Sequence, residues 1–478
     1  MGVGHPPAPG ARIPDMHRTP RFATSLALAI ACVGCGSAVA PSVGPEATSA
    51  PVLATLMPGA PPGQRTAPPL RQPAGQSPTV AETAPPGTGP PTVAEITRLQ
   101  AAVAADPDDA AAQRDLGLVL IQRIRETADP SLYAGAAAAL DTARRLAPDD
   151  ALALVGLGGL QLGKHEFADA LVTGRAAVER SPRLASARAV VVDALVELGR
   201  YDEADAAAGE MLALSTNLST LSRVSYLAEL RGRLDVALNA MRQAAASPGL
   251  APENIAFANA LLGTLLTYTG DPAAAADAYA RALALVPAHA PSLAGEARLA
   301  VAAGRLSDAI ALYQRAADIL PLPEYVIALA DTQLAAGRPD AAARNLKVAG
   351  TEIELFAATG VVVDLDLALF EADHGDPKEA LPFAQAAYDA APTVRAADAL
   401  GWALHRLGRD REARERSREA LRLGSRDPLF RYHAGVIAAA LGDVRDARRD
   451  LQLALATDPG FSATGADEAR RILASLPD

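Results

Sequence analysis

Cysteine and lysine are almost absent from this chain. The two cysteines, Cys32 and Cys35, both lie near the N-terminus, and only three lysines occur among 44 basic residues. Disulfide bonds, zinc–thiolate sites and cysteine nucleophiles are therefore excluded from everything after residue 35. The formal net charge of −11 argues against a nucleic-acid partner, which requires a basic face.

Aromatic residues are also scarce, at 4%, and strand-like alternation and β-branched runs are rare. Half of the residues are nevertheless hydrophobic, and many of these are alanine. Alanine is the best helix former, and its small side chain lets helices approach closely. The composition predicts an all-α fold.

The motifs of common catalytic sites are missing. The chain has no Gly-rich phosphate loop, no His-Glu-x-x-His and no Gly-x-Ser-x-Gly. The acidic clusters at 106–109 and 149–150 lack calcium-loop spacing and are typical of helix caps. His405 and His433 could converge, but a pair alone does not make a site. We predict a protein that is not an enzyme, with no catalytic, cofactor-binding or metal-binding residues.

One charged segment leaves two interpretations open. Residues 406–426 hold eight arginines against four acidic residues. They form either a solvated helix face with pairs such as Arg411–Glu415 and Glu412–Arg416, or a patch for an acidic partner.

The N-terminus is typical of an export signal. After Met16, Arg18 and Arg21 precede a mostly apolar run over 22–33, which is too short to span a bilayer. The sequence Val33-Gly34-Cys35-Gly36-Ser37 resembles a bacterial lipobox, which implies lipidation of Cys35 and a membrane anchor. The alternatives are lipidation of Cys32 or plain cleavage of the signal peptide. Because Met16 is a better start, residues 1–15 are interpreted as a misassigned start.

A linker follows the signal. Residues 41–91 contain 14 prolines and only four charges, so this stretch cannot bury a core. We predict a disordered linker over 36–91 that ends where Thr92 and Glu95 form a capping box for the first helix.

The rest of the chain repeats. Eight glycines recur at steps of 33, 38, 34, 33, 38, 33 and 34 residues, and each is followed five residues later by alanine. Such a period indicates one helix–turn–helix unit copied in series. Each glycine is expected to end a helix in the left-handed conformation, and the two long steps to be loop insertions. The glycines are Gly199, Gly232, Gly270, Gly304, Gly337, Gly375, Gly408 and Gly442.

The unit resembles the tetratricopeptide repeat. That family has Leu-Gly in its first helix, Gly at the turn, Ala, an aromatic and Ala in its second helix, and a closing Pro. The matching residues in one unit are Leu262, Gly263, Gly270, Ala275, Tyr279, Ala282 and Pro287. The resemblance implies a right-handed superhelical solenoid of about ten repeats over 92–461, with a capping helix in 462–478.

In this family the first helices line a concave groove that binds peptides or proteins. Projection of the unit places Asp193, Tyr226, Thr264, Arg298, Asp331, Leu369, Trp402 and Val436 on that surface. Tyr432 and His405 fall one turn away. From these we take as candidate partner-binding residues Tyr226, Arg298, Asp331, Trp402, His405 and Tyr432. Trp402 and Tyr432 are the expected hot spots, although Trp402 could instead fill the core.

The resemblance implies a non-catalytic scaffold of the bacterial cell envelope that binds protein or peptide partners. Two alternatives remain. One is a cytoplasmic adaptor or regulatory repeat protein with a misread start. The other is a carbohydrate-binding solenoid in polysaccharide export, which would need aromatics along several units.

Overall fold

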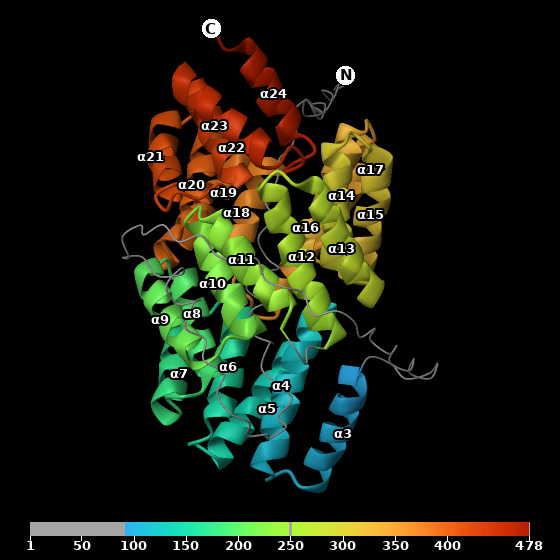
Figure 1. Ribbon diagram of the computed structural model, residues 1–478, viewed down its shortest axis with the longest axis vertical. Coiled ribbons are helices and arrows are strands. Elements are labelled where there is room, and N and C mark those ends of the chain that lie inside the picture. Colours follow the sequence, from blue (N-terminus) through green and yellow to red (C-terminus); the bar gives the residue numbers. More distant parts are fainter. Residues whose placement is uncertain (1–90, 248–250, 478) are drawn as a thin grey trace, which may run out of the picture.

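The computed structural model describes residues 91–247 and 251–477, which form 22 helices and no strand (Figure 1). The predicted signal peptide, Cys35 and nearly all of the predicted linker lie outside the described residues, so they stay predictions. No described helix combines the length and apolarity needed to cross a bilayer. The architecture is an all-α superhelix of repeated helix pairs.

Ten consecutive pairs lie between α3 (Pro91–Ala105) and α24 (Gly465–Ser475). The first helices are α4 (Ala110–Thr127), α6 (Ala151–Gly163), α8 (Ala185–Glu197), α10 (Leu218–Leu230), α12 (Pro252–Tyr268), α14 (Ala290–Ala302), α16 (Pro323–Ala335), α18 (Asp364–Asp373), α20 (Val394–Arg406) and α22 (Pro428–Ala440). The second helices are α5 (Leu132–Leu146), α7 (Phe167–Arg180), α9 (Tyr201–Leu214), α11 (Leu234–Ala245), α13 (Pro272–Leu285), α15 (Leu306–Ile319), α17 (Pro339–Ala358), α19 (Pro377–Ala390), α21 (Asp410–Ala420) and α23 (Val444–Thr457).

Small residues set the distance between the helices of a pair. The alanine five residues after each repeated glycine is completely buried in every unit. Gly263 and Gly295 lie on either side of Tyr279, and a Cβ on either glycine would come within 3.0 Å of the ring. Glycine and alanine recur at these positions because larger side chains would push the helix axes apart.

The repeated glycines end the first helices as expected, with one exception. Seven of the eight have positive φ angles between 67° and 79°. Gly375 does not, so the prediction is wrong there. It lies two residues after the end of α18, as the other glycines do after their helices, but the following N–H, of Asp376, donates to the Glu371 side chain at 2.9 Å instead of to a backbone carbonyl. In an earlier unit His165 takes the left-handed position, with φ 61°.

Two local predictions are wrong. Helix α3 begins at Pro91, so Thr92 lies inside its first turn and donates to Glu126 Oε2 at 2.6 Å instead of capping the helix. Glu95 accepts from Arg98 Nε at 2.8 Å. The long step from Gly337 to Gly375 is not a loop insertion, since the extra residues extend α17 to 20 residues.

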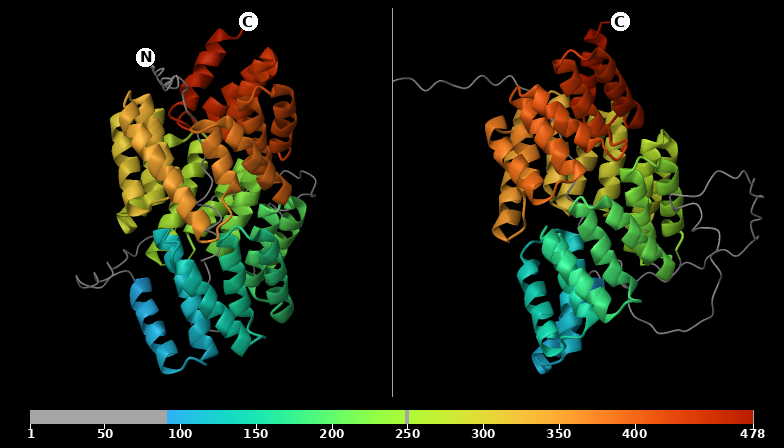
Figure 2. Two further views of the ribbon diagram at one scale, coloured as in Figure 1. Left: turned by 180° about the vertical axis from the view of Figure 1, so that it is seen from behind. Right: turned by 90° about the vertical axis from the view of Figure 1, so that its left-hand side faces the viewer.

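The superhelix closes on itself, so that late units contact early ones. Figure 2 shows, from behind, the orange chain after α17 reaching the blue-to-green helices. Val362 donates its backbone N–H to the Lys164 carbonyl at 3.1 Å, and Val394 donates to the Tyr201 hydroxyl at 3.0 Å. One hydrophobic cluster also joins Leu116 to Phe356.

We call this contact zone the seam. It is formed by the C-terminal ends of first helices α6 to α14 on one side. The other side consists of the N-terminal ends of α18, α20 and α22, the loops before them, and the loop before α24. Gly360 and Gly424, both with positive φ, lie in these loops. The Gly424 carbonyl lies against the turn at Gly232.

Candidate functional site

The residues predicted to face inward fall one per first helix, from α8 to α22. Neighbours along this row touch in places, since Arg298 Nη2 donates to Thr264 Oγ1 at 3.2 Å. Asp193 is held by Arg223, whose Nη2 lies 2.6 Å from its Oδ2. The members of the row differ in exposure.

Trp402 and Tyr432 are both fully buried, at 0% exposure. Trp402 Nε1 donates to Asp373 Oδ1 at 2.7 Å, and the indole stacks on His433 with ring centroids 4.1 Å apart. Tyr432 donates its hydroxyl to Glu468 at 2.9 Å. The expectation that these two are exposed hot spots is wrong, because helices of the same and following units cover them.

Asp331 is also not an open groove residue, since it is 1% exposed. The imidazole of His374 lies beside it, with Nε2 3.9 Å from Asp331 Oδ1. Burial lowers the pKa of His374 to about 3, which favours the neutral imidazole. Burial and the nearby Asp373 raise the pKa of Asp331 well above its ordinary value.

The other three candidates are half-buried. Tyr226 interacts with Arg395, and desolvation raises the pKa of its hydroxyl well above the usual value. Arg298 keeps 16% side-chain exposure and lies 3.5 Å from Asp458. His405 pairs with Asp410 at 2.6 Å and stacks on Trp402, and burial lowers the pKa of His405.

Projection from the sequence missed several polar residues at the seam. Glu197 and Glu229 lie one turn beyond the predicted inward positions on α8 and α10, so extending the projection by a turn would have found them. Asp366, Arg395 and Asp427 lie at the beginning of α18, α20 and α22, or just before it. No sequence pattern within one repeat predicts these three residues, because they come to lie at the seam only when late units pack against early ones.

These seam residues retain some exposure but are strongly desolvated. Burial and the neighbouring Asp427 raise the pKa of Glu229 to about 7, and Arg298 opposes the shift. Burial raises the pKa of Asp366 to about 6, opposed by Arg395. Partial exposure together with desolvation indicates that both face a recessed interior and not bulk solvent.

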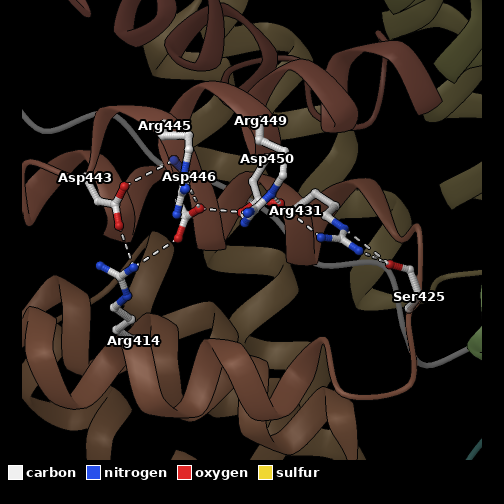
Figure 3. Close-up of polar contacts among 8 residues, drawn as sticks. All are labelled: Arg414, Ser425, Arg431, Asp443, Arg445, Asp446, Arg449 and Asp450. Carbon is white, nitrogen blue, oxygen red and sulfur yellow. Dashed lines mark hydrogen bonds and ion pairs between the residues drawn. The ribbon is translucent and has the colours of Figure 1, made fainter.

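The arginine-rich segment is neutralised in part, since three of its eight arginines, Arg409, Arg414 and Arg416, form ion pairs with acidic side chains. Arg414 reaches Asp443 at 2.6 Å and Asp446 at 3.0 Å, linking α21 to α23 (Figure 3). Arg431 reaches Asp450 at 3.0 Å on the same network. This favours the interpretation as a paired helix face.

The pairs on α21 differ from those predicted. Glu412 pairs with Arg409 at 2.6 Å and Arg416 with Glu419 at 2.8 Å, both at three-residue spacing. Elsewhere the predicted capping role of the acidic clusters is confirmed, since Asp109 and Asp150 accept from the first backbone N–H groups of α4 and α6. Within 91–247 and 251–477, no three His, Cys, Asp or Glu side chains form a group that could hold a metal.

Comparison with known proteins supports the repeat assignment. The model of the tetratricopeptide repeat matches residues 131–185, 260–322 and 399–460. No curated protein matches the chain.

Similar solved structures resemble the fold only distantly. YrrB, described as a tetratricopeptide protein with an unusual peptide-binding site, is 20% identical over 38% of this chain and 92% of its own, with a TM-score of 0.28. The pilus biogenesis factor PilW is 18% identical over 41% and 90%, with a TM-score of 0.36. PilF of Pseudomonas aeruginosa is 20% identical over 44% and 96%, with a TM-score of 0.35. The family-model match shows that the chain contains tetratricopeptide repeats, and the structure arranges its helix pairs in an all-α solenoid.

Proposed function

We propose that this chain is a non-catalytic scaffold of the bacterial cell envelope that binds protein or peptide segments at the seam inside its superhelix. Tetratricopeptide repeats support the interaction role in general. The observation that supports this location is the recessed, desolvated set of polar side chains around Tyr226 and Glu229. Groups of this kind are enriched where a ligand completes their interactions.

Site-specific photocrosslinking tests the binding location. A photoreactive amino acid replaces Tyr226 at the seam or Val172, which is 69% exposed on α7. If partners bind at the seam, discrete crosslinked products form from position 226 and not from position 172. Equal products from both positions, or none from position 226, would contradict the proposed location.

The envelope location rests on the N-terminal sequence. A lipid on Cys35 would hold the repeats at a membrane surface, with the proline-rich stretch as a spacer. Metabolic labelling with palmitate checks this, with Cys35→Ala as the variant and Cys32→Ala as its matched control. If the label is lost in Cys35→Ala and kept in Cys32→Ala, the result supports a lipid anchor on Cys35. If the wild type carries no label, the lipid anchor is ruled out, and the protein is a cytoplasmic adaptor or has a signal peptide that is simply cleaved.

A further inference from the structure

The loop between α17 and α18 lies across the seam with alternate side chains buried. Val361 and Val363 are 6% and 7% exposed, whereas Val362 between them is 46% exposed. Such alternation arises when one face of an extended chain lies against a surface. The two buried valines belong to the hydrophobic cluster that also contains Leu120 of α4 and Leu160 of α6. We call residues 361–363 the strap.

Both backbone polar groups of Val362 are bound by the turn between α6 and α7. The Val362 N–H donates to the Lys164 carbonyl at 3.1 Å. The Val362 carbonyl lies 2.7 Å from His165 Nδ1, and because a carbonyl can only accept, this nitrogen is the donor. Proteins that bind extended peptides use the same combination, with backbone hydrogen bonds for affinity and pockets for alternate side chains for specificity.

His165 is an unusual residue for its place in the repeat. With φ 61° it adopts the left-handed conformation, which is strained for a residue that has a Cβ. Gly199 and Gly232 hold the same place at the two following turns of the seam and contact the late loops without a side chain. Strained residues of this kind cluster at binding and switch regions, where the side chain has a task. Here the side chain binds the carbonyl of the strap.

The strap also leaves a junction that is loosely packed. Helix α17 makes few contacts with α18, whereas α15 packs closely against α16. Gly360, with φ 83°, begins the strap at the end of α17. Release of the strap therefore does not require two closely packed helices to separate.

We propose that the strap is an internal occupant of a peptide-binding position and that a partner segment displaces it. The position consists of the turn at Lys164 and His165 and the apolar surface that receives the two valines. The partner supplies a segment with small apolar side chains at two alternate positions, and its backbone takes over both hydrogen bonds of Val362. The strap limits binding to segments that outcompete it, because a tethered ligand acts at an effective concentration on the order of millimolar. This inference rests on the proposed peptide-binding function and adds the chemistry of the bound segment and its autoinhibition.

Competition by a free peptide tests the strap in the unaltered chain. A synthetic peptide with the sequence of residues 359–365, Thr-Gly-Val-Val-Val-Asp-Leu, is added to the wild type. Displacement removes the acceptor of the Val362 N–H, so hydrogen exchange of the strap accelerates when it is followed by mass spectrometry. Exchange at Val394, whose N–H donates to the Tyr201 hydroxyl elsewhere in the seam, stays unchanged and is the internal control. A peptide with serine in place of the first and third valines has no effect.

Matched variants measure the affinity by fluorescence anisotropy of the fluorescein-labelled peptide. Val361→Ser/Val363→Ser removes the buried side chains of the strap, so the peptide binds this strap variant about tenfold or more tighter than the wild type. The control Val348→Ser/Leu355→Ser changes two exposed residues of α17 and leaves the affinity as in the wild type. His165→Gly, added to the strap variant, gives the turn the glycine of the other units but removes the donor, which weakens binding about tenfold. Circular dichroism of each variant excludes unfolding as the cause.

Each part of the proposal has a result that overturns it. Unchanged exchange of the strap at saturating peptide, or equal affinity for the wild type and the strap variant, would overturn the internal occupant. Unchanged affinity after His165→Gly would overturn the role of the histidine. If the peptide binds no variant while position 226 still crosslinks partners, the strap site is wrong and the proposed function stands. Failure of both experiments contradicts the proposed function itself.

Discussion

Replacing one of two equivalent glycines tests whether the superhelix is closed in solution. Gly232 and Gly270 occupy the same position in successive units, with φ of 67° and 79°. A Cβ on Gly270 would meet nothing within 4 Å, whereas one on Gly232 would lie under 3.0 Å from the Gly424 carbonyl oxygen. Both alanine variants therefore lose stability because alanine must adopt the left-handed conformation of the turn. Only Gly232→Ala also creates a clash across the seam.

The structure gives a magnitude for each variant. Alanine in the left-handed conformation costs about 1–2 kcal/mol, and this applies to both. The clash at Gly232 involves backbone and cannot be relieved by a rotamer change, so overpacking adds about 1–3 kcal/mol. We expect Gly270→Ala to lower the free energy of unfolding by about 1–2 kcal/mol and Gly232→Ala by about 2–5 kcal/mol.

Urea unfolding followed by far-UV circular dichroism measures the difference, and small-angle X-ray scattering measures the radius of gyration. Gly232→Ala should also increase the radius of gyration, because its clash opens the seam, whereas Gly270→Ala should leave it unchanged. If the two variants lose the same stability and keep the same dimensions, the late units do not touch the early ones in solution.

Three further predictions concern buried polar groups. Trp402→Phe removes the donor to Asp373 and should cost about 1–3 kcal/mol in urea unfolding; no loss would mean that this hydrogen bond is not formed. Arg298→Met should cost about 3–5 kcal/mol by stranding the buried Asp458, and adding Asp458→Asn should restore much of this, whereas additive losses would contradict a direct ion pair. The pKa of Glu229 is raised from an ordinary 4.5 to about 7 in the folded state, so folding favours its protonated form. The stability that the protonated carboxyl contributes to the fold is therefore complete below pH 4.5 and is lost as the pH rises through 7. Glu229→Gln should therefore raise the urea midpoint at pH 8 but not at pH 5, and an equal effect at both values would refute the shift.

Much of the fold follows from local sequence. The alanines five residues after the repeated glycines are all completely buried, because a helix pair fixes which positions of its second helix face the neighbouring helix. Gly375 lacks the left-handed φ of the other glycines, and there the Glu371 side chain, instead of a backbone carbonyl, accepts the N–H of Asp376. Thr92 does not cap the first helix as predicted, because α3 already begins at Pro91. Proline suits the first turn of a helix, where its missing N–H has no partner to lose.

The candidate site was only partly predictable. Projection brought Trp402, His405 and Tyr432 together, and their rings do lie within 5.9 Å of the indole. It did not predict that Trp402 would be enclosed, because exposure depends on the units that cover it. Glu229 and Asp427 were missed because their proximity has no counterpart in sequence spacing.

By itself, the sequence determined the helix pairs, their turns and their close packing, since each depends on residues within one unit and its neighbours. Only the tertiary structure decided that the superhelix closes. Small rotations between successive units accumulate along the array, and their sum sets whether distant units meet. His165 and Val362 are 197 residues apart, yet their 2.7 Å contact at the seam results from that sum. The desolvated carboxylates owe their altered chemistry to the same closure.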